Sequence, residues 1–261
     1  MWILGVLLVA AAVGGFFYMQ ATKRELHAII GTDTLTIPEL EDLRRISDEL
    51  GARGGFRKTS EVVGAAHPRP EGVLTSEISK APCVWYRYRV EREYEHMEYR
   101  DGRRRYSKRR EKVADHTSDA GYALIDQQGC TIGVAPGGAR PEGVERSVDR
   151  FEPYHGGDQS FDLFGIRIPG LLAGNRDSTI GYHYQEWLIR PGTPLYVLGE
   201  VHDIIGPLVI AKPQRKGHFI VSAKSEQQLR DDRTRRHKLL AIGVLVAFFA
   251  GIALTVVGIV R

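Results

Sequence analysis

Cysteine is scarce in this chain: Cys83 and Cys130 are the only two among 261 residues. Two cysteines cannot build the disulfide framework that stabilises many small secreted domains, nor a zinc site with four cysteine ligands. A single disulfide between them stays open. In the cytoplasm, where thiols are kept reduced, the sequence instead predicts two unpaired and buried thiols.

The common motifs of catalysis and metal binding are also missing. The chain contains no GxSxG nucleophile elbow, no GxxxxGK[ST] or GxGxxG phosphate loop, and no HExxH or CxxC pattern. The chain has nine histidines, and the short motif that joins His155 to Asp158 has low specificity as a metal or catalytic signal. We therefore predict no catalytic residue, no metal site and no cofactor. A triad assembled from residues far apart in the sequence stays open.

Charge is absent from both ends of the chain. Residues 2–18 and 239–260 contain no Asp, Glu, Lys or Arg and are rich in Leu, Val, Ala, Gly and Phe. A helix rises ~1.5 Å per residue, so these segments are of about the length that crosses the ~30 Å hydrocarbon core of a bilayer. The alternative for the first segment is a cleaved signal peptide, but no basic residue precedes it. The sequence predicts two transmembrane helices.

Basic residues flank these segments on their inner sides. They are Lys23, Arg24, Arg230, Arg233, Arg235, Arg236 and Lys238. Lys and Arg near membrane spans are retained on the cytoplasmic side. We therefore expect a two-pass protein whose middle domain is cytoplasmic.

The interior is nearly balanced in charge. Of the 36 basic residues, all except Arg261 lie within residues 21–238, together with all 32 acidic residues. A balanced domain lacks the strong positive field that attracts nucleic acid. We expect no nucleic-acid partner.

One amphipathic helix precedes the β-rich part. Thr36 and Glu39 have the spacing of a capping box, and Gly51 suits the C-terminal end of the helix. Four apolar residues share one face, which predicts that the helix packs against another part of the protein or a partner; they are Leu40, Leu43, Ile46 and Leu50.

Between the two spans, the sequence predicts a β-rich α+β fold. Aromatic and β-branched residues alternate with polar ones from residue 61 onward, with short helical turns near 151–154 and 169–173. The predicted structure is a small twisted sheet or partial barrel flanked by N- and C-terminal transmembrane helices. The predicted divisions are a transmembrane helix at 1–20, a linker and amphipathic helix at 21–60, a β-rich domain at 61–224, a juxtamembrane helix at 225–238 and a transmembrane helix at 239–261.

A strongly basic hairpin stands out within the domain. Asp101 and Gly102 separate two long polar strands, which predicts a tight hairpin turn. Six basic residues cluster near this turn: Arg103, Arg104, Arg105, Lys108, Arg109 and Arg110. They favour a solvated hairpin whose charges prevent pairing with other chains, ahead of contact with anionic lipid headgroups.

Several moderately specific segments follow one another in a fixed order. They are residues 61–66, 83–92, 121–125, 186–201, 206–213 and 219–222. The most specific of these segments is 186–201. Four of its residues have structural explanations: Glu186, Gly192, Gly199 and Glu200. Gly192 belongs to a turn, Gly199 allows a close approach, and a carboxylate in an apolar strand must be paired or face solvent.

This order of segments between two membrane helices resembles the GIDE family, whose soluble part is called the BAM ("beside a membrane") domain. The resemblance covers nearly the whole chain and implies a RING-type ubiquitin transferase. The ligases of the family carry a zinc-binding RING after the second span, whereas this sequence ends at Arg261. We therefore expect a BAM-type binding or sensing module with a protein partner and no catalysis of its own. The alternatives are a transferase acting with a separate RING partner, a membrane-surface hydrolase, and a structural scaffold.

Overall fold

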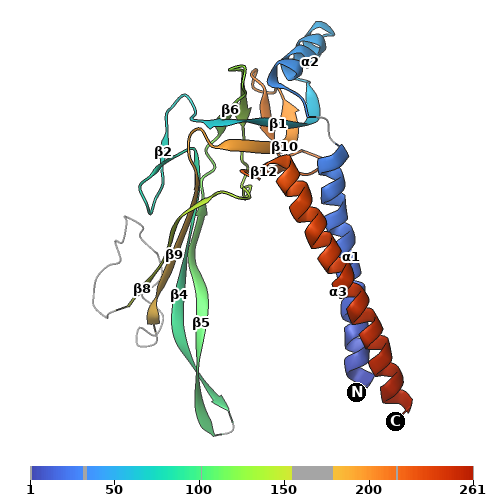
Figure 1. Cartoon of the computed structure of the whole chain (residues 1–261). Coiled ribbons are helices and arrows are strands. Elements are labelled where there is room, and N and C mark those ends of the chain that lie inside the picture. Colours follow the sequence, from blue (N-terminus) through green and yellow to red (C-terminus); the bar gives the residue numbers. More distant parts are fainter. Residues whose placement is uncertain (1, 32–33, 101, 155–178, 216, 261) are drawn as a thin grey trace.

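The computed structural model describes residues 2–31, 34–100, 102–154, 179–215 and 217–260. Two long apolar helices lie at the two ends of the chain, and a β-rich domain lies between them (Figure 1). The prediction of a β-rich α+β fold between N- and C-terminal apolar helices is confirmed.

The two terminal helices pack against each other. Helix α1 spans Trp2–Gly31 and helix α3 spans Glu226–Val260. A Cβ atom on Gly5 would lie 2.7 Å from the carbonyl oxygen of Gly251, so the two backbones touch where both residues lack a side chain. Such close crossings at small residues are typical of helix pairs within membranes.

Both helices are apolar enough to cross a membrane. The candidate spans are Ile3–Gln20 within α1 and a window within Glu226–Gly258 of α3, and few of their residues are buried. The polar residues from 226 to 238 continue into the apolar part of α3 without a break.

Helix α2 spans Ile37–Glu49 and begins where the sequence predicts. Thr36 caps it through a full capping box with Glu39, and Gly51 follows it with a φ of +83°. Leu40 is buried, but Leu43, Ile46 and Leu50 are 37%, 52% and 81% exposed. The helix therefore packs against the domain through its first turn, and the rest of its apolar face is exposed.

A small five-stranded barrel forms the centre of the domain. Its strands follow one another in the order β1 (Arg57–His67), β6 (Tyr122–Ile125), β7 (Thr131–Val134), β11 (Val209–Ala211) and β10 (Pro194–His202). Pairing of β10 with β1 closes the barrel, and β12 (Ile220–Ser222) adds to the other edge of β10. Buried aliphatic residues such as Leu124, Val197 and Ile210 fill the interior.

Strand β1 begins four residues earlier than expected. The sequence predicted a linker up to residue 60, but Arg57 to Ser60 pair with β10 in the same register as the rest of β1. The charged and hydroxyl side chains of this segment carry no hydrophobic signal, and the strand is fixed by its partner β10.

A second sheet extends from the barrel. Its order is β5 (Arg103–Thr117), β4 (Trp85–Arg100), β9 (Thr179–Ile189) and β8 (Glu145–Pro153), and all its pairings are antiparallel. The short strands β2 (Leu74–Thr75) and β3 (Pro82–Cys83) form a separate pair. In Figure 1 the second sheet and the pair of terminal helices leave the barrel in the same general direction.

The helical turn predicted near 151–154 is wrong, because residues 145–153 form strand β8. This strand is largely exposed and lacks a clear alternation of buried and exposed residues, so its conformation is fixed by pairing with β9. The turn predicted near 169–173 lies outside the described residues.

Candidate functional site

The basic hairpin is formed as the sequence predicts. Strands β4 and β5 stay paired up to Arg100 and Arg103, which leaves a two-residue turn at the tip. Gly102 has a φ of +74°, a conformation that glycine adopts without strain. Asp101 lies outside the described residues.

Part of the positive charge on the hairpin is neutralised across the two strands. The Glu93 carboxylate accepts a hydrogen bond from Arg110 Nε at 2.9 Å and lies 3.9 Å from Lys108 Nζ. Within the described part of the chain, no ion pair involves Arg103, Arg104, Arg105 or Arg109, and all four are exposed. The tip therefore carries a cluster of basic groups in contact with solvent.

Glu186 lies at the centre of a network of hydrogen bonds in the second sheet. It is fully buried on β9 and accepts hydrogen bonds from Ile78 N–H at 2.7 Å and Ser79 N–H at 3.1 Å. The hydroxyls of Ser76 and Ser147 donate to it at 3.2 and 2.8 Å, and the Ser79 hydroxyl donates as well.

These donors hold Glu186 in its charged form. Burial alone raises the pKa of this carboxyl, but the hydrogen bonds from Ser79, Ile78 and Ser147 outweigh it, so the pKa lies below its ordinary value. The carboxylate ties the 76–79 segment and β8 to β9. Its hydrogen-bond donors all lie within the domain.

The other residues of the 186–201 segment also have local explanations. Gly192 has a φ of +84° in the turn between β9 and β10. A Cβ atom on Gly199 would lie 2.7 Å from the carbonyl oxygen of Ala211, so the close approach of β11 to β10 requires glycine there. Glu200 is half-buried near the end of β10, opposite Thr59 and Ala211.

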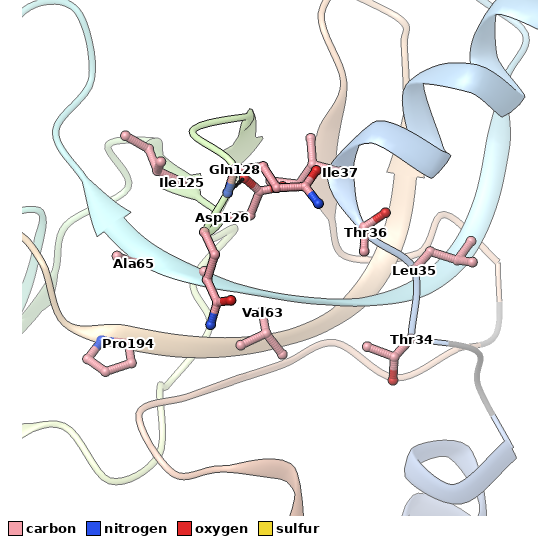
Figure 2. Close-up of a pocket in the computed structure, with 12 residues that line it drawn as sticks. Thr34, Leu35, Thr36, Ile37, Val63, Ala65, Ile125, Asp126, Gln128 and Pro194 are labelled. Carbon is pink, nitrogen blue, oxygen red and sulfur yellow. Dashed lines mark hydrogen bonds between the residues drawn. The ribbon is translucent and has the colours of Figure 1, made fainter.

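A groove of about 520 Å³ lies along strand β1 where α2 begins. Its walls come from four separate segments of the chain, which are residues 34–37, 63–65, 125–128 and Pro194. Figure 2 shows Ile125, Asp126, Gln128 and Ile37 on one side of the β1 ribbon, and Val63 on the other. The groove therefore follows the edge of β1.

The lining of the groove is mainly apolar, and Val63 is 54% exposed within it. Asp126 is charged, and its Oδ1 accepts hydrogen bonds from Gln128 N–H and Cys130 N–H, both at 2.9 Å. The other described residues of the lining include no charged side chain, histidine or cysteine.

The remaining reactive groups do not assemble into a centre. Cys83 and Cys130 are unpaired; Cys83 is buried, as predicted, whereas Cys130 is half-buried. Burial raises the pKa of the Cys83 thiol to about 11, which keeps it protonated at neutral pH. Among the described residues, no three His, Cys, Asp or Glu side chains come together as metal ligands. His155 and Asp158 lie outside those residues.

Comparison with protein families gives a match over residues 90–258 to GIDE, described as an E3 ubiquitin ligase. This match covers more than half of the chain. The chain belongs to the GIDE family. No curated protein and no solved structure matched.

The GIDE match includes the basic hairpin, Glu186 and the 191–200 segment, and it ends within α3. It begins at Val90, within β4, so β1 and the first turn of α2 precede it. The groove thus joins residues inside the match, such as Ile125 and Asp126, to residues before it, such as Leu35 and Val63.

Sequence reasoning singled out the hairpin and the 186–201 segment and missed the groove. The sequence contains no local signal for it, because its walls are brought together only when the barrel closes.

Proposed function

We propose that this GIDE domain is a membrane-anchored binding module whose ligand occupies the groove along β1. The observation that supports this proposal is the combination of a sizeable apolar hollow with the lack of acid–base partners among its lining residues. A hydrolase needs a nucleophile and a base within hydrogen-bonding reach of each other. Asp126 has no such neighbour in the groove lining.

The two terminal helices supply the anchor in this proposal. Apolar residues such as Phe17, Leu245 and Phe249 are exposed along them, which is stable in lipid and costly in water. The basic residues between the two apolar segments, from Lys23 to Lys238, support a domain on the cytoplasmic side. Two anchors hold the barrel near the bilayer and restrict its rotation.

The hairpin tip supports a second contact, with anionic lipid headgroups. The support for this contact is the charge and exposure of the arginines at the tip. In Figure 1 the tip lies level with the far ends of α1 and α3, so the contact requires the second sheet to lie at an angle to the two helices. A hairpin with this many charges is excluded from hydrocarbon. Its favourable position is the headgroup layer, where each basic residue gains ~1 kcal/mol.

The description of the family as an E3 ubiquitin ligase favours a link to ubiquitin transfer. In our proposal the domain contributes binding, and a separate RING-containing partner supplies the transferase activity. The groove would then hold a partner or a substrate protein at the membrane surface.

Photocrosslinking from the groove tests the binding proposal. A benzoylphenylalanine at Val63 should give discrete protein adducts in native membranes. Phe151, an exposed apolar residue on β8, is a matched control position and should not give the same adducts. Identical adducts from both positions, or none from Val63, would contradict a ligand in the groove.

A further inference from the structure

The backbone of β1 offers unpaired hydrogen-bonding groups in the groove. In a strand, the N–H and C=O groups of successive residues point alternately to the two neighbouring strands. Ala66 N–H donates to Thr193 O at 2.8 Å, so the even-numbered residues of β1 face β10. Leu35 N–H donates to Glu61 O at 3.2 Å on the opposite side. The N–H and C=O of Val63 must therefore point away from β10.

That side of β1 is open at Val63. Thr34 bridges to Glu61 in a parallel sense, and Thr36 then caps α2 and turns the chain away. Strand β6 pairs with β1 only from Ala65 to His67. Between these two contacts, no strand in the described part of the chain pairs with β1 on this side.

The groove lies at this gap. Residues from both faces of β1 line it, and the exposed Val63 side chain stands beside Ala65 and Pro194 (Figure 2). An extended chain placed there would find apolar contacts for its side chains and a free backbone donor and acceptor. Because an unpaired edge of this kind recruits strands, its natural occupant is another backbone in extended conformation.

We propose that the groove binds an extended, apolar peptide segment of a partner protein, which adds to the edge of β1 beside Val63. This inference rests on the proposed binding function and names its ligand class. The peptide continues the contact that Thr34 and Leu35 already make with the same edge at Glu61.

The geometry limits the ligand. Only about three residues of β1 lie between the Thr34 bridge and β6, so at ~3.3 Å per residue the paired part of the peptide spans roughly 10 Å. Among the described lining residues Asp126 alone is charged, which disfavours Asp or Glu in the bound segment.

The test uses a displayed library of random hexapeptides, selected on the full chain in lipid nanodiscs. Selected peptides should be apolar and depleted in Asp and Glu. Replacing the peptide N–H groups one at a time by N-methyl groups should weaken binding roughly tenfold or more at one position, the residue whose N–H donates to the Val63 carbonyl. It should have little effect at the two adjacent residues, because their N–H groups point to the other edge of the bound strand.

Two variants of the protein test the backbone hydrogen bond that the Val63 N–H would donate to the peptide. Val63→Pro removes the N–H that faces the groove, at a position where an edge strand tolerates proline, and should weaken peptide binding by a similar factor. Val63→Thr keeps that N–H and a β-branched side chain and should bind nearly normally. Thermal unfolding of both variants shows whether Val63→Pro is folded, and the N-methyl scan does not depend on it.

The outcomes separate the two levels of the proposal. Val63→Trp fills the groove with a larger side chain. If the selected peptides bind the parent chain and not Val63→Trp, but N-methylation weakens binding at no single position, strand addition is overturned and the groove remains a binding site. If every selected peptide binds this variant as well as it binds the parent chain, strand addition is overturned. If, in addition, photocrosslinking from position 63 gives no protein adducts, the binding function is overturned too.

Discussion

Replacing Glu186 by Leu should lower the free energy of unfolding by about 3–5 kcal/mol, the usual cost of breaking a buried charged network. The substitution leaves two backbone N–H groups and three hydroxyls without their acceptor inside the second sheet. Denaturant unfolding of the full chain in detergent, followed by tryptophan fluorescence, measures the loss.

A matched control is available in β10, the next strand along the chain. Glu200 is half-buried on β10, and within the described residues it makes no hydrogen bond or ion pair through its side chain. Glu200→Leu should therefore change stability by roughly 1 kcal/mol or less. Equal losses in the two variants would contradict the role assigned to Glu186.

The same network sets the direction of a pH effect. The pKa of Glu186 is lower in the folded protein than in the unfolded chain, so its contribution to stability is complete above the ordinary glutamate pKa of about 4.3. That contribution should be lost as the pH falls through the lowered folded value. In Glu186→Gln, this part of the acid sensitivity should disappear.

Replacing Arg103, Arg104 and Arg105 by Ser should weaken binding of the hairpin tip to anionic lipid. The free energy of binding should fall by up to ~3 kcal/mol, which is roughly a hundredfold in affinity. The three side chains are exposed, and none makes an ion pair with another described residue. The full chain in nanodiscs, incubated with separate anionic vesicles, gives the affinity by co-flotation. Added salt should weaken binding of the parent chain, because screening shortens the reach of its charges.

Three arginines away from the tip provide the control. Arg53, Arg140 and Arg215 are exposed in loops, and their replacement by Ser removes the same formal charge. That variant should retain most of the affinity for the vesicles. Both variants should keep nearly the stability of the parent chain, because exposed charges contribute little to folding. Equal loss of vesicle binding in both would show an effect of net charge alone.

The elements that could be predicted are those whose sequence signal lies within a few neighbouring residues. The hairpin follows from Asp101 and Gly102 between two polar strands, and the start of α2 follows from the spacing of Thr36 and Glu39. Each of these signals lies within a few residues and fixes the backbone directly.

The parts that failed depend on distant partners. Strand β8 has little hydrophobic alternation and becomes a strand because β9 offers an edge. The face of α2 has a helical apolar period, yet Ile46 and Leu50 remain exposed since the helix leaves the barrel after its first turn. Periodicity shows which face of an element is apolar and does not show what covers it.

The groove illustrates the same limit for a site. Leu35, Val63, Ile125 and Pro194 are ordinary apolar residues whose spacing along the chain follows no motif. They form a hollow because the barrel closes through β1 and α2 turns the chain away from that strand's edge. Only the pairing of strands shows that Val63 has an open side.

Labelling of one exposed cysteine tests most directly whether two membrane helices hold the domain on the cytoplasmic side. Ser107→Cys places a thiol on the exposed hairpin, and the parent chain, whose Cys83 is fully buried and Cys130 partly buried, gives the background. An impermeant maleimide should leave Ser107→Cys unlabelled in intact cells and label it once the plasma membrane is selectively permeabilised, with the chain remaining in carbonate-washed membranes. Labelling in intact cells, or release of the chain by carbonate, would contradict a cytoplasmic domain anchored by α1 and α3.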